Sequence, residues 1–91
     1  MIARRIIVRG KVQGVFYRNW TMVTARSLRL NGWVRNLSSG EVEILAIGSA
    51  EAVEDLIQQC WEGPFGAVVE EVVAEKAQLE PVLGFEMRRT A

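Results

Sequence analysis

The spacing of apolar residues switches between period two and helical period along the chain, and this change constrains the fold more than any other feature. Alternating and β-branched runs predict five strands, at residues 3–12, 33–37, 41–47, 67–76 and 85–88. Helical spacing predicts a first helix from Asn19 to between Leu28 and Gly32, and a second from Ser49 to Glu62. The predicted order is strand, helix, strand, strand, helix, strand, followed by a short extra strand.

This order predicts an α+β fold with the ferredoxin-like βαββαβ arrangement. In this sandwich two helices lie on one face of a mainly antiparallel sheet, here of four to five strands. The chain has 91 residues, so we expect residues 1–91 to form a single domain. Many unrelated functions use this fold, so the fold alone does not predict a function.

The predicted helices carry signals for where they begin and which side they bury. Asn19 and Ser49 are residue types that cap helix N-termini. The expected buried side of the first helix contains Trp20, Val23 and either Ser27 or Leu28.

The missing residue types exclude several kinds of catalysis. The chain has no histidine, which excludes Ser-His-Asp and Cys-His catalysis and zinc sites that contain histidine. Asp55 is the only aspartate and falls on an expected solvated helix face, which argues against a two-metal carboxylate site. We therefore expect no metal and no cofactor, and catalysis by backbone amides, arginine, side-chain amides and hydroxyls.

The single cysteine is a poor candidate for a nucleophile. A cysteine phosphatase would need an arginine six residues later, where this chain has Gly66. Cys60 instead continues the apolar stripe of the second helix, after Val53, Leu56 and Ile57. The pattern predicts a buried, unreactive thiol.

Charge is divided unequally between the two halves of the chain. Residues 1–40 contain eight basic residues and no acid, whereas residues 41–91 contain all eleven acids and three basic residues, so the halves carry +8 and −8. One interpretation is an anion site in the first half. The other is that the two halves pair their charges across one sheet. Charge alone does not decide between them.

The bulk properties also bear on location and partners. No segment approaches the ~18 consecutive apolar residues of a membrane span, and no signal-peptide core follows Met1. A single cysteine excludes an internal disulfide framework. Zero net charge argues against a nucleic-acid partner. We expect a cytoplasmic protein that contacts no membrane or nucleic acid, with a monomer as the default.

The segment from Gly10 to Arg18, between the first strand and first helix, carries the chemistry. Gly14 permits a positive φ and close backbone approach, so successive amide N–H groups can converge on an anion. The next helix begins at once, and its N-terminal amides and dipole favour the same anion. The Arg18 guanidinium can add a planar, bidentate contact to phosphate oxygens.

Two motifs resemble the signatures of the acylphosphatase family. The first is Gly10-x-Val12-Gln13-Gly14-Val15-Phe16-Tyr17-Arg18, and the second is Gly32-Trp33-Val34-Arg35-Asn36-x-x-x-Gly40-x-Val42. The resemblance extends over nearly the whole chain. It implies that phosphate is bound by Arg18 and by the amides of Gln13, Gly14, Val15, Phe16, Tyr17 and Arg18.

The resemblance further implies that Asn36 orients the attacking water. Read without it, Asn36 is a turn residue before Ser38-Ser39-Gly40. Trp33, Phe16 and Tyr17 are interpreted as packing residues rather than substrate contacts.

The implied activity is hydrolysis of acyl phosphates to a carboxylate and inorganic phosphate by direct attack of water. Inorganic phosphate or sulfate should bind as an inhibitor-like anion. One departure from the family pattern is Arg29, where glycine is common. If the chain turns there, Arg29 takes a positive φ at a cost of about 1 kcal/mol; otherwise the helix runs on toward Gly32.

Two rival functions share this fold. The first is an interaction module like the acylphosphatase-like domain of hydrogenase-maturation carbamoyltransferases, which belongs to a much longer chain; the present length favours an enzyme. The second is a single-stranded RNA binder, which needs aromatic residues on the central strands. Residues 2–12 and 41–48 contain none.

Overall fold

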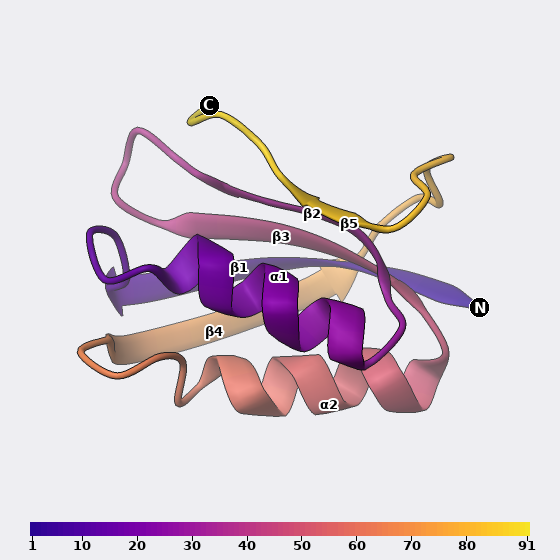
Figure 1. Ribbon diagram of the computed structural model, residues 1–91, viewed down its shortest axis with the longest axis horizontal. Helices are drawn as coiled ribbons and strands as arrows, with labels where there is room; N and C mark the ends of the chain where they lie inside the picture. Colours follow the sequence, from indigo (N-terminus) through magenta and orange to yellow (C-terminus); the bar gives the residue numbers. More distant parts are fainter.

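The computed structural model describes residues 1–91, which form five strands and two helices (Figure 1). The elements are, in chain order, β1 (Ile2–Lys11), α1 (Tyr17–Ser27), β2 (Asn31–Asn36), β3 (Val42–Gly48), α2 (Ala50–Cys60), β4 (Val68–Lys76) and β5 (Phe85–Met87). This order confirms the predicted α+β, βαββαβ arrangement with a short extra strand.

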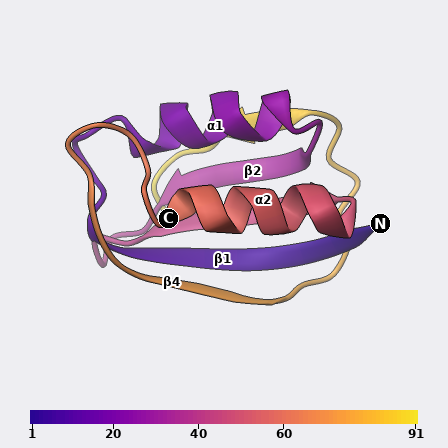
Figure 2. The same cartoon turned by 90° about the horizontal axis from the view of Figure 1, so that it is seen from below.

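The strands form one sheet in the order β4-β1-β3-β2-β5. Three strand pairs are antiparallel, and β5 alone lies parallel to its neighbour β2. Both helices lie on the same face of the sheet (Figure 2). The C-terminal ends of β1 and β2 and the N-terminal end of α1 lie toward one end of the molecule, on the left in Figure 1.

The core lies between the sheet and the helices. Strand alternation turns every second side chain toward the helices, and the largest buried apolar side chains there include Ile6, Val8, Val34, Ile44, Val53 and Leu56. Cys60 belongs to the same cluster and is fully buried, as predicted. Neither helix has the length and apolar character needed to cross a bilayer.

The two predicted helix starts have different outcomes. The prediction for α2 is confirmed, since the Ser49 hydroxyl accepts a hydrogen bond from the Ala52 amide at 3.1 Å. The prediction for α1 is wrong: the helix begins at Tyr17, its N-cap is Phe16, and Asn19 lies within the first turn. The side of α1 that faces the core is set by Tyr17, which is buried there, and it therefore differs from the predicted side.

The buried residues of α1 are accordingly Tyr17, Thr21 and Ala25. Trp20 is partly buried against the core, whereas the predicted core residue Val23 is 56% exposed. The buried row is spaced by four residues, as expected for one side of a helix. It contains a threonine and an alanine in place of large apolar residues, which is why hydropathy alone missed it.

Helix α1 ends in a left-handed turn at Arg29, which has φ 58°. The Leu30 amide donates to the Ala25 carbonyl and the Arg29 amide donates to the Arg26 carbonyl, both at 3.0 Å. These two bonds form the Schellman motif, whose left-handed position is usually glycine. The chain therefore turns at Arg29 with a positive φ, and the alternative in which the helix runs on toward Gly32 is wrong.

Replacing Arg29 with glycine should raise the free energy of unfolding by about 1 kcal/mol, because glycine takes a positive φ without steric cost. Denaturant unfolding of both proteins measures the difference. Arg29→Ala is the matched control: it removes the same exposed side chain but keeps the strained Cβ, so it should gain nothing. Equal stabilisation by both substitutions would show that φ strain at this position is not the cause.

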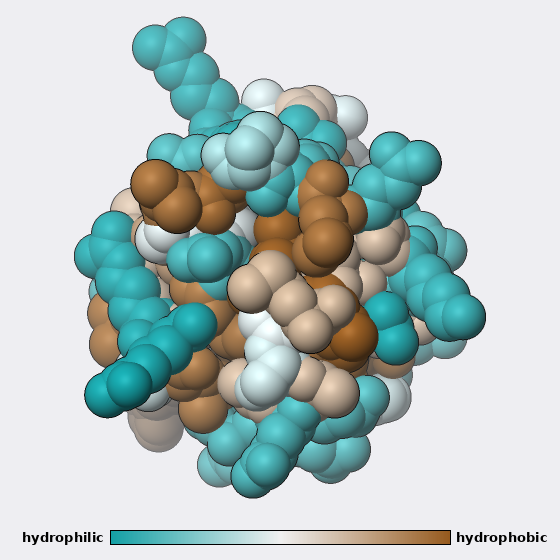
Figure 3. Space-filling model, turned by 90° about the vertical axis from the view of Figure 1, so that its right-hand side faces the viewer, coloured by the Kyte–Doolittle hydropathy of each residue, from teal (hydrophilic) through white to brown (hydrophobic).

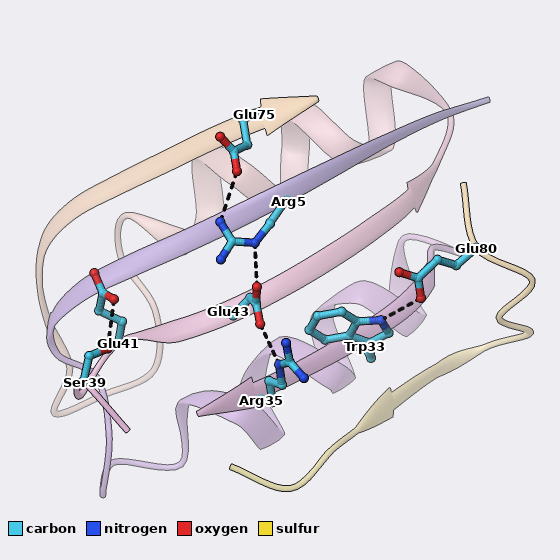
Figure 4. A network of polar contacts seen from close by, with 8 residues as sticks. All are labelled: Arg5, Trp33, Arg35, Ser39, Glu41, Glu43, Glu75 and Glu80. Atoms are coloured by element: carbon cyan, nitrogen blue, oxygen red, sulfur yellow. Dashed lines mark hydrogen bonds and ion pairs between the residues drawn. The ribbon is translucent and has the colours of Figure 1, made fainter. Parts of the chain in front are cut away.

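The open face of the sheet carries the paired charges (Figure 4). Arg5 forms ion pairs with Glu43 and Glu75, and Arg35 donates to the other oxygen of the buried Glu43 carboxylate at 2.6 Å. Arg9 pairs in the same way with Glu41 and Glu71. For these three arginines the charge split reflects pairing across the sheet.

Trp33 is a packing residue, as predicted, and lies on this open face. It is 7% exposed and clusters with Ala3, Leu45 and Ile47, and its indole N–H donates to the Glu80 carboxylate (Figure 4). The opposite end of the molecule from the first loop exposes apolar atoms among charged ones (Figure 3). Exposed apolar side chains of the chain start and the β4–β5 connection are Met1, Leu79 and Leu83.

Candidate active site

The loop between β1 and α1 is shorter than predicted, because strand pairing continues through Gly10 and Lys11. The register with β4 shifts between Arg9 and Gly10, and a Cβ atom at Gly10 would lie 2.2 Å from the Val68 carbonyl oxygen. Only glycine fits this close approach. The loop is therefore residues 12–16, and Tyr17 and Arg18 belong to the first turn of α1.

The backbone amides of the loop and of the start of α1 have no hydrogen-bond partners in the protein. Gly14 and Phe16 have positive φ values of 76° and 63°, the kind of backbone that gathers N–H groups into an anion-binding concavity. None of the amides of residues 13–18 donates a hydrogen bond within the protein. The N-cap side chain makes no capping bond, and the first helical turn has no acidic residue.

A buried anchor fixes the start of α1. The Tyr17 hydroxyl donates to the Cys60 carbonyl oxygen at 2.6 Å, which ties the first turn of α1 to the last turn of α2. The Tyr17 ring also packs edge-on against Trp20, with ring centroids 5.3 Å apart. Burial raises the pKa of the Tyr17 phenol above its ordinary value and that of the Cys60 thiol to about 12. Both groups are structural, as predicted.

Arg18 differs from the arginines of the open face because it has no partner in the protein. No ion pair or hydrogen bond is formed by its guanidinium. It shares a side of α1 with Arg26, whose Nε donates to the Phe85 carbonyl at 3.0 Å, so this side faces β5. Arg18 is therefore a cation without a partner in the protein, and it lines the cavity beside the loop.

Asn36 is the last residue of β2 and not part of the turn that follows it. Alternation along β2 puts Asn36 on the helix-side face with Val34. Its Oδ1 atom is buried and has no hydrogen-bond partner. A buried carbonyl oxygen without a partner is costly, so this acceptor is a strong candidate to bind a polar ligand group.

The Gln13 side chain connects the loop to the turn after Asn36. Its Nε2 group donates to the carbonyls of Leu37 and Glu41, both at 2.9 Å. The sequence gives no signal for this bridge, because it joins residues 24 and 28 positions apart. Gln13 thus contributes a side-chain contact in addition to its predicted backbone amide.

A cavity of about 340 Å³ brings these groups together. The predicted residues in its lining are Gln13, Gly14, Phe16, Tyr17, Arg18 and Asn36. Val15 is absent from the lining, and its side chain packs against the core. Val12, Asn19 and Met87 also line the cavity and were not predicted.

Comparison with known proteins identifies this arrangement. The family model described as acylphosphatase matches residues 4–87. This chain belongs to the acylphosphatase family. An acylphosphatase of Acidiphilium cryptum is 44% identical over 90 residues, covering 99% of each chain. An acylphosphatase of Nostoc sp. is 44% identical over 89 residues, covering 98% of this chain and 88% of the other.

Solved acylphosphatases share the fold in full. The Bacillus subtilis enzyme superposes with a TM-score of 0.93 at 34% identity, covering 97% of this chain and 99% of the other. The chain's activity is that of an acylphosphatase, the hydrolysis of acyl phosphates. Full-length HypF is also similar, at 28% identity, but this chain covers only 12% of it. The relatives matched over nearly their full length are acylphosphatases, which favours the enzyme over the interaction-module interpretation.

Replacing Gln13 with alanine should lower kcat of the acylphosphatase about tenfold, since two hydrogen bonds of about 1 kcal/mol each hold the turn beside Asn36. The amide at position 13 remains, so the inhibition constant of inorganic phosphate should change by less than kcat does. Steady-state kinetics with phosphate inhibition measures both. Gln59→Ala, on the exposed side of α2, should change neither. An unaltered kcat in Gln13→Ala would rule out the bridge as a positioning element.

Proposed function

We propose that the enzyme holds the phosphate of an acyl phosphate on the amides of residues 13–18 and on Arg18, while Asn36 orients the water that attacks phosphorus. The observation that carries the proposal is that these groups have no partner in the protein and belong to the same region of it. Six backbone donors, an unpaired guanidinium and a buried, unpaired carbonyl oxygen belong to one cavity and its loop.

Phosphate binding follows from these donors. Each charge-assisted hydrogen bond to an anion contributes about 1.5–3 kcal/mol. The positive end of the α1 dipole adds to this attraction, and no acidic residue in the first turn opposes it. These groups also face the three non-bridging oxygens over which charge spreads in the transition state.

Asn36 supplies the acceptor for the water. The Oδ1 atom would accept a hydrogen bond from the water. This contact would orient the water so that a lone pair on the water oxygen is directed at phosphorus. The new P–O bond forms opposite the acyl oxygen, and the bond from phosphorus to that oxygen breaks with its electron pair. The water's proton passes to a phosphate oxygen.

The leaving group explains why no histidine is needed. A carboxylate, whose conjugate acid has a pKa of about 4, departs without protonation. Direct transfer to water also requires no nucleophilic side chain, and burial raises the pKa of the Cys60 thiol to about 12. A covalent phosphoenzyme trapped during turnover would contradict direct attack.

The purified protein should hydrolyse benzoyl phosphate in the presence of a chelator, with competitive inhibition by inorganic phosphate and sulfate. Loss of ultraviolet absorbance follows the reaction. We expect chelator to leave the rate unchanged, because the proposed donors are backbone amides and a guanidinium. Activity that disappears with chelator and returns with a divalent metal would overturn this proposal.

We further propose that residues 1–91 act as one cytoplasmic, monomeric domain without nucleic-acid or membrane partners. Support comes from the single sheet that carries the whole chain and from the free Cys60 thiol. Light scattering that gave a mass near 10.2 kDa would agree with a monomer, and twice that mass would contradict it.

A further inference from the structure

Phe16 combines a left-handed backbone with an exposed aromatic side chain, and the fold requires neither the aromatic ring nor its exposure. It has φ 63° and ψ 29°, a left-handed conformation that is strained for a bulky side chain. Glycine or asparagine would take the same backbone at lower cost. The turn itself therefore gives no reason for a phenylalanine at this position.

Packing in the core gives no reason either, because the Phe16 side chain is 83% exposed. The sequence-based interpretation of Phe16 as a packing residue is wrong for this reason. Its neighbours Val15 and Tyr17 pack against or within the core, whereas Phe16 lies at the wall of the cavity. Strained residues of this kind concentrate at functional sites.

Met87 adds a second apolar group to the cavity. It lies on β5 in register with Val34 of β2, and is 46% exposed although it lines the cavity. The lining of the cavity thus combines polar groups, Arg18 and Asn36 among them, with the exposed apolar side chains of Phe16 and Met87. An acyl phosphate likewise combines an anionic part with an apolar part.

We propose that Phe16, with Met87, forms a subsite for the apolar acyl group, so that the preferred substrates are acyl phosphates with a chain or ring larger than acetyl. This inference rests on the proposed function, in which the phosphate occupies the loop. Binding of the acyl group would cover the exposed ring of Phe16 and remove apolar surface from water on both sides.

Acetyl, butanoyl and hexanoyl phosphates provide the test, because their leaving carboxylates are chemically alike and differ in apolar length. Wild-type kcat/KM should rise from acetyl to hexanoyl phosphate by about tenfold or more. Phe16→Asn keeps a residue that tolerates the left-handed backbone but removes the apolar group, so most of this preference should disappear. Phe16→Leu keeps an apolar group and should retain most of it.

Phe65→Ala is the matched control, since Phe65 is a fully exposed phenylalanine outside the cavity; it should keep the wild-type preference. Met87→Ala should lower the preference for hexanoyl phosphate. A wild-type enzyme indifferent to chain length, or a preference unchanged in Phe16→Asn, would overturn the subsite. Failure to hydrolyse any of the three substrates would instead contradict the proposed function, so the two failures are distinguishable.

Discussion

Replacing Arg18 with alanine is expected to lower kcat/KM by about 10²–10⁴-fold, because the two hydrogen bonds of a bidentate guanidinium contribute about 1.5–3 kcal/mol each. The inhibition constant of inorganic phosphate should rise together with the loss of activity, since the same contacts serve substrate and inhibitor. Steady-state kinetics and phosphate inhibition measure both changes. The fold should survive, because Arg18 has no ion pair or hydrogen bond in the protein to lose.

Two further variants make the Arg18 prediction specific. Arg18→Lys keeps the charge but loses the planar pair of donors, so its activity should fall between wild type and Arg18→Ala. Arg26→Ala removes an arginine from the same side of α1, where it contacts the Phe85 carbonyl away from the loop. Phosphate inhibition should be unchanged in Arg26→Ala. Equal loss in Arg18→Ala and Arg26→Ala would point to general electrostatic attraction instead of a defined contact.

Asn36→Ala should separate catalysis from phosphate binding. Its kcat should fall by about 10²–10³-fold, while the inhibition constant of inorganic phosphate stays near the wild-type value. The reason is that the loop amides and Arg18 remain, whereas the acceptor that orients water is removed. Stability should not fall in proportion, because the buried Oδ1 atom has no partner in the protein. Unfolding measurements and kinetics on the same samples separate the two effects.

Asn31→Ala is a suitable comparison for Asn36→Ala because both residues lie on β2. The Asn31 side chain accepts a hydrogen bond from the Gly84 amide at 2.9 Å, so its loss should lower stability and leave kcat unchanged. If phosphate binding were lost equally in Asn36→Ala and Arg18→Ala, the separate roles of the two residues would be wrong.

The sequence predicted the fold from local pattern, and the parts it missed depend on contacts between distant residues. Alternation and helical spacing located every strand and helix to within a few residues. The start of α1 was misplaced because Tyr17 is held by the Cys60 carbonyl, 43 positions away. Likewise, nothing local indicates that β5 lies beside β2 and brings Met87 to the cavity.

The residues of the candidate site could be predicted because the sequence around them has local signals that the fold class by itself does not provide. Glycine at position 14, the following helix and Arg18 each have a local physical reason to bind an anion, and all three meet at one cavity. The charge split was ambiguous because pairing across the sheet accounts for some of the basic residues of the first half and not for others. Arg5, Arg9 and Arg35 pair with glutamates across the open face, and Arg18 does not.

The most direct test of phosphate binding is a titration of the ¹⁵N-labelled protein with inorganic phosphate, followed by two-dimensional NMR. The amide signals of residues 13–18 and the side-chain Nε of Arg18 should shift in a saturable manner, with a dissociation constant equal to the inhibition constant from kinetics. Shifts confined to other arginines, such as Arg26 and Arg29 at the far end of α1, would contradict the account.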